Sequence, residues 1–394
     1  MNPPRPPADR AGTPVPPASP VPSASPVPST SPVPSASRHA APPYSLSGAR
    51  GTAPAPDRPR TRTGPRAWAE LLRISALFTV PGDALAGAAA AGHRPGRGTV
   101  LAVGASLCLY EAGMALNDWA DRAEDAVDRP HRPIPSGRIT PGAALAAAAT
   151  LTASGLALAA CAGRPALAVA TGLAATVWAY DLHLKHTPAG PAAMATARSL
   201  DLLLGAAATC GAPGTPPAGR ASRPRPARPA GPGGRAPRPG AGHALPTALP
   251  AALVLGAHTC AVTHVSRHEA HGGSTTAPTA ALATAAALAA AVLRTNRLPS
   301  RGRRAPAPGP RGTGRTLALT AFTGAYLRTA ARPLLHAALN PSPPLTRRSV
   351  GGGIRAMIPL QAALATRAGA PLTGLAVMGL GPLARSLARK VSPT

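Results

Sequence analysis

The segment Leu116–Thr140, with the sequence LNDWADRAEDAVDRPHRPIPSGRIT, holds the densest group of side chains that could do chemistry. Asn117, Asp121 and Asp125 are spaced four apart, so on a continuous helix they lie within about 80° of one another, with a rise of ~6 Å per step. The chain has only 13 acidic residues, and five of them fall here within eleven positions: Asp118, Asp121, Glu124, Asp125 and Asp128. The spacing gathers their oxygen atoms mainly on one helical face.

These oxygens would collect at the C-terminal end of an incoming helix, where the helix macrodipole disfavours negative charge. A positive group should therefore sit among them. Mg²⁺ suits this place, because it takes one or two carboxylates and leaves its other positions to water and phosphate oxygens. The alternative is a solvated acidic turn with salt bridges to Arg122, Arg129 and Arg132. We favour the metal site, because the cluster follows an apolar run directly in an acid-poor chain.

The elements that would position this cluster are apolar runs of about twenty residues, the length that crosses a bilayer. They predict an all-α integral membrane bundle of nine transmembrane helices. A soluble helical bundle is the alternative, since most runs are rich in Ala, which drives insertion less strongly than Leu. The predicted spans are 68–92, 98–119, 141–162, 165–182, 192–212, 246–265, 276–294, 315–338 and 354–382.

Composition divides the chain further. Residues 1–66 form a tail rich in Pro, Ser and Ala, with a recurring Ser-Pro-Val-Pro-Ser pattern that cannot bury a core, and we expect it to be disordered. Residues 67–394 make up the transmembrane domain. Within it, residues 211–245 and 295–313 are rich in Pro, Gly and Arg and are predicted to be disordered insertions.

The net charge of +28 would ordinarily suggest a nucleic-acid partner. The arginines, however, lie largely in Pro/Gly-rich linkers without the interleaved aromatic residues of a binding surface. We therefore expect a lipid bilayer as the chain's surroundings and no nucleic acid. Neither does the sequence imply a protein partner. A soluble helical protein that binds nucleic acid through its arginines is the weakest of the readings.

The loops after the second, fourth, sixth and eighth predicted helices share one character. They are the Asp-rich segment, Tyr180–Pro191, Ser266–Gly273 and Asn340–Arg355, and each places charged or His residues beside Gly or Pro turns. Because an even number of spans separates them, all four must emerge at the same end of the bundle. One end of the bundle is therefore chemically specified.

The pattern Asn117-xxx-Asp121-xxx-Asp125, followed by Arg-Pro and by Ile134–Gly137, resembles the first Asp-rich motif of the UbiA superfamily of intramembrane prenyltransferases. Nine helices with this motif after the second helix also match that fold. Segments similar to the EboC-like branch of the superfamily are Leu71–Gly87, Gly190–Gly205 and Ile354–Gly369. The resemblance covers roughly residues 68–390 without the insertions.

The resemblance implies a Mg²⁺-dependent transfer of a prenyl group from an isoprenoid diphosphate to a small aromatic acceptor, carried out in the cell membrane by a multi-pass protein. Asn117, Asp121 and Asp125 would bind the metal. Lys185, in the family's Tyr/Lys loop with Tyr180, would neutralise the diphosphate and would act in catalysis with the two aspartates. The further residues expected to contact substrate are Arg73, Arg198, Arg267 and Glu269.

This chain departs from the family in one place. Members usually carry a second Asp-rich motif after helix six, whereas this loop reads Ser-Arg-His-Glu and offers Glu269 as its only carboxylate. We therefore expect a single Mg²⁺ assisted by Arg267, since Arg can grip phosphate in a bidentate way. The alternative is a non-catalytic membrane protein that binds or transports a prenylated or phosphorylated small molecule.

Several polar side chains fall inside the predicted spans, where such groups are costly and tend to be functional or paired. Arg198 and Asp201 are three residues apart on one helix, so the sequence leaves open a pair between them or a contact with the diphosphate. Glu111 could support the metal ligands. The full set is Asp83, Glu111, Arg198, Asp201, Arg328 and Gln361.

Overall fold

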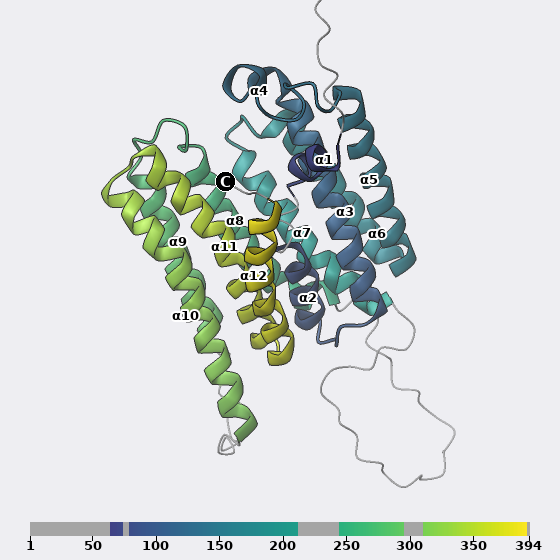
Figure 1. The fold of residues 1–394 in the computed structure, drawn as a ribbon. Coiled ribbons are helices and arrows are strands. Elements are labelled where there is room, and N and C mark those ends of the chain that lie inside the picture. Colours follow the sequence, from purple (N-terminus) through teal and green to yellow (C-terminus); the bar gives the residue numbers. More distant parts are fainter. Residues whose placement is uncertain (1–63, 74–78, 212–243, 295–309, 392–394) are drawn as a thin grey trace, which may run out of the picture. The chain divides into compact units, whose positions relative to one another are not determined.

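The computed structural model describes residues 64–73, 79–211, 244–294 and 310–391, and every element in this part is helical (Figure 1). The all-α prediction is confirmed. The elements are α1 (Pro65–Leu71), α2 (Val80–Ala90), α3 (Arg97–Ala120), α4 (Arg122–Asp128), α5 (Pro141–Ala162), α6 (Arg164–Ala179), the π-helical turn η2 (Tyr180–Leu184), α7 (Gly190–Gly211), α8 (Ala244–Ser266), α9 (Thr276–Leu293), α10 (Pro310–Leu339), α11 (Pro343–Arg367) and α12 (Pro371–Val391).

Helices α3, α5, α6, α7, α8 and α9 match the second to seventh predicted spans within a few residues. The predicted tail lies almost wholly outside the described residues, although α1 begins at Pro65. The two predicted insertions lie largely outside them as well. Helix α8 begins at Ala244 and α10 at Pro310, so both helices take over the last residues of an insertion.

The first predicted span, 68–92, is wrong as a single helix. Helix α1 ends at Leu71, and Arg73 just beyond it has a φ of 48°, a backbone conformation that L-residues rarely adopt. Helix α2 then begins at Val80, with Pro81 in its first turn. Proline is accommodated there because the first amides of a helix have no intrahelical partner. Pro81 is thus a helix start, and the span is divided.

The last predicted span, 354–382, is also wrong, because two helices cover it. Helix α11 ends at Arg367, Gly369 adopts a φ of 93°, and α12 begins at Pro371. The segment Asn340–Arg355, which the sequence predicts as a loop, is mostly the first half of α11. Its glycines allow close packing, since a Cβ on Gly352 would stand 2.9 Å from the Pro333 ring. Close approach between helices outweighs the low helix propensity of glycine.

Helices α2 and α7 pack against each other almost backbone to backbone. A Cβ on Gly87 would collide with the main chain of Leu202, and one on Gly205 would collide with that of Ala84. Both helices contribute to two buried clusters of mostly Ala and Leu side chains, one shared with α3, α5 and α6 and the other with α8 to α12. Small residues therefore let the helix backbones at the centre of the bundle approach closely and pack through van der Waals contacts.

Five described helical segments are long and apolar enough to cross a membrane. They are Arg97–Ala120, Pro141–Ala162, Arg164–Leu184, Ala244–Ser266 and Thr276–Leu293. The prediction of membrane-spanning helices is thus supported for these five, and the predicted number of nine is not established.

Candidate active site

The specified loops converge at one end of the bundle, as the sequence predicts. The Lys185 ammonium group, after η2, forms an ion pair with Asp121 after α3. Arg267, after α8, donates a hydrogen bond to the Thr187 carbonyl oxygen at 2.7 Å. The Gly273 amide donates to the Pro341 carbonyl oxygen at 2.8 Å, which links the loops after α8 and α10. Four segments far apart in the sequence therefore build one polar end.

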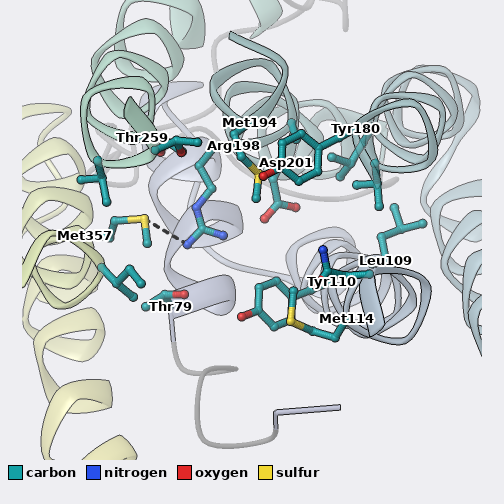
Figure 2. Close-up of a pocket in the computed structure, with 18 of the residues that line it drawn as sticks. Thr79, Leu109, Tyr110, Met114, Tyr180, Met194, Arg198, Asp201, Thr259 and Met357 are labelled. Carbon is teal, nitrogen blue, oxygen red and sulfur yellow. Dashed lines mark hydrogen bonds between the residues drawn. The ribbon is translucent and has the colours of Figure 1, made fainter. Parts of the chain in front are cut away.

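A cavity of about 460 Å³ opens among α3, α6, α7, α8 and α11 below this end (Figure 2). Its wall is mainly apolar, with Leu109, Val177 and Met194 among the lining residues. Four of the predicted site residues also line it, namely Arg73, Asn117, Tyr180 and Arg198. The cavity thus combines room for an apolar group with polar side chains at both ends.

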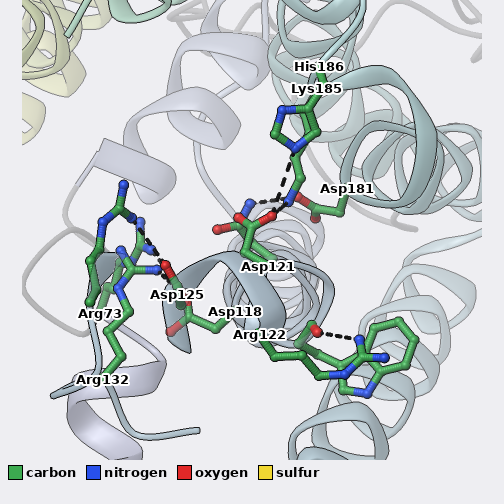
Figure 3. A network of polar contacts seen from close by, with 12 residues as sticks. Arg73, Asp118, Asp121, Arg122, Asp125, Arg132, Asp181, Lys185 and His186 are labelled. Atoms are coloured by element: carbon green, nitrogen blue, oxygen red, sulfur yellow. Dashed lines mark hydrogen bonds and ion pairs between the residues drawn. The ribbon is translucent and has the colours of Figure 1, made fainter. Parts of the chain in front are cut away.

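One half of the polar mouth is built around Asp181 (Figure 3). Asn117 donates a hydrogen bond from Nδ2 to Asp181 Oδ1 at 3.0 Å, and the Asp181 side chain is buried. Asp181 lines the large cavity and also a second, smaller hollow in which Asp121 and Lys185 lie. The π-helical turn accounts for this geometry. The Lys185 amide donates to the Tyr180 carbonyl oxygen five residues back, and this wider turn shifts the helical register between Asp181 and Lys185.

The other half of the mouth holds Asp118 and Asp125, and both are buried and paired with arginines (Figure 3). Arg132 lies 2.6 Å from Asp125 and 3.3 Å from Asp118, Arg73 lies 3.1 Å from Asp118, and Arg129 lies 3.5 Å from Asp125. This is the salt-bridged arrangement that the sequence leaves open as an alternative for Arg129 and Arg132. Arg122 instead stacks on Trp119, with 4.5 Å between its guanidinium carbon and the ring centroid.

The three predicted metal ligands therefore have different neighbours. Helix α3 ends at Ala120 and Asp121 caps it, so Asn117 and Asp125 do not lie on one continuous helix. Asp121 faces Lys185, whereas Asp125 faces Arg132. Among the described residues, Asp121, Glu124 and His186 bring ligand atoms within 4.8 Å of one another, which is a second possible set for a cation.

Arg198 lies at the inner end of the cavity. Its Nη1 lies 3.0 Å from Asp83 Oδ2 on α2, and its Nη2 contacts the Met357 sulfur at 3.3 Å. Gln361 donates to Asp83 Oδ1 at 2.6 Å, and Asp201 accepts a hydrogen bond from Ser106. The sequence leaves open a pair with Asp201 or a contact with the diphosphate for Arg198. The ion pair in the structure is with Asp83 on α2 and matches neither alternative.

Arg267 and Glu269, the other predicted substrate contacts, lie beside the mouth and do not line either hollow described above. Arg267 is exposed, and Glu269 is half-buried. Burial raises the pKa of the Glu269 carboxyl, while the nearby Arg347 and Arg129 act in the opposite direction. The structure thus leaves these two residues at the rim of the polar end.

Sequence reasoning missed Asp181, Arg132 and Ser106 as site residues. A signal existed for Asp181, because it stands directly between Tyr180 and the lysine of the predicted loop, at the end of an apolar run. Arg132 was considered only as a partner in a surface salt bridge. For Ser106 no sequence signal existed, since its partner Asp201 lies 95 residues away on α7.

Comparison with known proteins places the chain in a family. The model of the UbiA prenyltransferase family matches residues 75–298, more than half of the chain. A digeranylgeranylglyceryl phosphate synthase of Methanopyrus kandleri is 38% identical over 128 residues, which are 31% of this chain and 45% of that protein. The bacteriochlorophyll synthase 33 kDa chain of Cereibacter sphaeroides is 41% identical over 88 residues, 21% of this chain and 28% of that one. The matched segments thus span less than half the length of these relatives.

Solved structures of similar arrangement include an apo UbiA homologue from Aeropyrum pernix, with 16% identity and a TM-score of 0.49 over 77% of this chain and 97% of that chain. A UbiA homologue from Archaeoglobus fulgidus bound to GPP and Mg²⁺ has 15% identity and a TM-score of 0.47 over 79% of this chain and 99% of that chain. The extent of the family match settles the assignment: this chain belongs to the UbiA prenyltransferase family.

Proposed function

We propose that the protein transfers a prenyl group from an isoprenoid diphosphate to a small acceptor inside the cell membrane, with the aid of Mg²⁺. The observation that carries this proposal is the position of the Asp121–Lys185 pair and the Asn117–Asp181 pair beside a largely apolar cavity of about 460 Å³. Charged groups at the mouth suit a diphosphate, and the apolar interior suits an isoprenoid chain.

The donor set at the mouth is compatible with Mg²⁺. Carboxylate and amide oxygens are the ligands that this ion prefers. Asn117 uses its amide nitrogen toward Asp181, which leaves its carbonyl oxygen for a cation. Asn117, Asp121 and Asp125 would hold the ion, and Asp125 would have to give up part of its pairing with Arg132. A bound Mg²⁺ would supply charge withdrawal from the leaving diphosphate.

Lys185 supports the diphosphate end. Its ammonium group is almost buried, with a side-chain exposure of 10%, and has the ion pair with Asp121 but no hydrogen bond to any described residue. A buried ammonium group has three donors, and most of them remain available for phosphate oxygens. Lys185 would therefore stabilise the charge that develops on the leaving group, in a site where a low dielectric strengthens the interaction.

The cavity wall supports the second part of the reaction. Ionisation of an allylic diphosphate leaves a carbocation that water would destroy, so the reacting carbon must be kept dry. Leu109, Val177 and Met194 line the cavity, and such side chains offer water no hydrogen-bond partners. We propose that an aromatic or other small nucleophile attacks there, and that the apolar wall keeps the cation for this acceptor.

A decisive experiment uses the full-length protein purified in detergent, labelled geranyl diphosphate, Mg²⁺ and a panel of aromatic and hydroxyl-bearing acceptors. We expect release of diphosphate together with a prenylated product. Tight binding of geranyl diphosphate without diphosphate release for any acceptor would contradict transfer and favour the binding or transport function. The arginines that already neutralise Asp118 and Asp125 are the observation that favours this second function.

A further inference from the structure

A cluster of polar side chains lies buried at the inner end of the cavity, away from the charged mouth. Its members, here called the floor cluster, are Asp83, Ser106, Arg198, Asp201 and Gln361. Ser106 and Asn117 are on the same helix, about three turns apart, which corresponds to ~16 Å along its axis. The floor cluster is therefore separate from the residues proposed to bind the diphosphate.

Arg198 is incompletely satisfied within the protein. Its side chain is only 11% exposed, its Nε has no hydrogen-bond partner among the described residues, and its Nη2 donates to the sulfur of Met357. A thioether is a weak acceptor, and a buried donor without a partner costs free energy. Figure 2 shows the guanidinium group of Arg198 among the residues that line the cavity, with the Asp201 carboxyl beside it. Arg198 and Asp201 both line the cavity, so a ligand oxygen in the cavity would lie beside this guanidinium group.

The charges of the floor cluster select the kind of oxygen. Arg198 stands between two buried carboxyl groups, those of Asp83 and Asp201, so the cluster has no excess positive charge with which to attract an anion. It offers an unpaired donor on Arg198 and an acceptor on Asp201 within one cavity. A neutral hydroxyl group can use both, because it donates one hydrogen bond and accepts others.

We propose that the floor cluster binds a neutral hydroxyl group of the acceptor substrate. Arg198 donates a hydrogen bond to the hydroxyl oxygen, and Asp201 accepts a hydrogen bond from the O–H. This inference rests on the proposed function. An isoprenoid chain has no group that could hydrogen-bond there, and the diphosphate belongs to the mouth, so the acceptor is the substrate that remains. Arg198 and Asp201 are thus specificity-determining residues that hold the acceptor at a point remote from the metal.

The test measures binding to the full-length protein in detergent, in the presence of Mg²⁺ and geranyl thiolodiphosphate, which does not ionise readily. Three probes with the same hexyl chain are compared: 4-hexylphenol, its methyl ether 4-hexylanisole, and 4-hexylbenzoate. We expect the phenol to bind about tenfold more tightly than either of the others, the effect of a buried hydrogen bond. Equal binding of phenol and ether, or preferred binding of the benzoate, would overturn the proposal without any variant.

The variant that tests the residues combines Asp83→Asn, Arg198→Met and Asp201→Leu, which removes all three charged groups of the floor cluster and so leaves no unpaired buried charge. The ratio between phenol and ether should fall from about tenfold to near one. The matched control is Thr209→Val, which removes a buried hydrogen bond to Thr99 away from the cavity and should leave the ratio unchanged. A ratio that survives in the triple variant would overturn the proposal.

The affinity for the diphosphate analogue separates this inference from the proposed function. If wild-type protein fails to bind geranyl thiolodiphosphate, the proposed function itself fails. If the analogue binds equally to wild type and to the triple variant, the variant is folded and the comparison of phenol and ether reports on the floor cluster alone.

Discussion

Asn117 on α3 and Asp181 in the π-helical turn η2, 64 residues apart in the sequence, meet through a hydrogen bond of 3.0 Å from the amide Nδ2 to the carboxyl Oδ1. This contact fixes the end of α3 against the end of α6. It engages the amide nitrogen of Asn117 and not its carbonyl oxygen. The mouth of the cavity therefore depends on the contact between Asn117 and Asp181. The sequence predicts only Asn117 as a site residue.

Substitution Asp121→Asn should reduce prenyl transfer by about 100-fold or more, because it removes the carboxylate that faces Lys185 and that we propose as a metal ligand. The measurement is release of diphosphate from geranyl diphosphate at saturating Mg²⁺. Asp128→Asn is the matched control, since Asp128 is exposed and lies at the end of α4. Equal losses in both variants would show that the effect is not specific to the site.

Lys185→Met should raise the KM for the prenyl diphosphate by about tenfold or more and lower kcat as well, because the ammonium group is expected to contact the phosphate in both the ground state and the transition state. Steady-state kinetics of purified protein give both constants. Arg164→Gln serves as a control, since Arg164 is an exposed cation at the start of α6, away from the mouth. Unchanged kinetics for Lys185→Met would remove the lysine from the site.

Removal of divalent cations should abolish activity, and added Mg²⁺ should restore it. The check is activity after treatment with EDTA and titration with Mg²⁺, followed in parallel with binding of the diphosphate. If activity survives complete chelation, then Arg132, Lys185 and their neighbours must stabilise the diphosphate without a metal.

Gly205→Ala should lower the free energy of unfolding by about 1–3 kcal/mol, because the new methyl group would overlap the backbone of Ala84 on α2. Gly324→Ala is the matched control: nothing lies within 4 Å of a Cβ at this position of α10, and alanine is the better helix former. Thermal unfolding in one detergent compares the two. A loss of stability in the control as large as that in Gly205→Ala would contradict the proposed tight contact.

Glu269→Gln should make the protein more stable than wild type near neutral pH, and the difference should shrink on acidification. Burial raises the pKa of this carboxyl in the folded state, so folding favours its protonated form. Its ionised form therefore costs stability above the folded pKa, and this cost disappears as the pH falls toward the ordinary value near ~4.3. Thermal unfolding of wild type and variant over a pH series tests the sign, which an equal response of both proteins would contradict.

The sequence by itself determined the helical class, the six central spans and the end of the bundle at which the specified loops meet. Hydrophobic runs of membrane length report directly on helices, because each helix satisfies its own backbone hydrogen bonds. The alternation of specified loops also sufficed to bring Asp121 and Lys185 to the same end. These properties are local or follow from counting the spans.

Only the tertiary structure decided which polar groups pair. The spacing predicts Asn117, Asp121 and Asp125 on one helical face. In the structure α3 ends at Ala120, and Asp125 on the following helix pairs with Arg132. The ion pair of Arg198 with Asp83 and the hydrogen bond of Ser106 to Asp201 join helices that are distant in sequence. Likewise, the glycines of α11 look like a turn in sequence but serve close packing. The pairing of polar groups depends on which helices lie within contact distance. The periodicity of each helix in the sequence does not specify its neighbours.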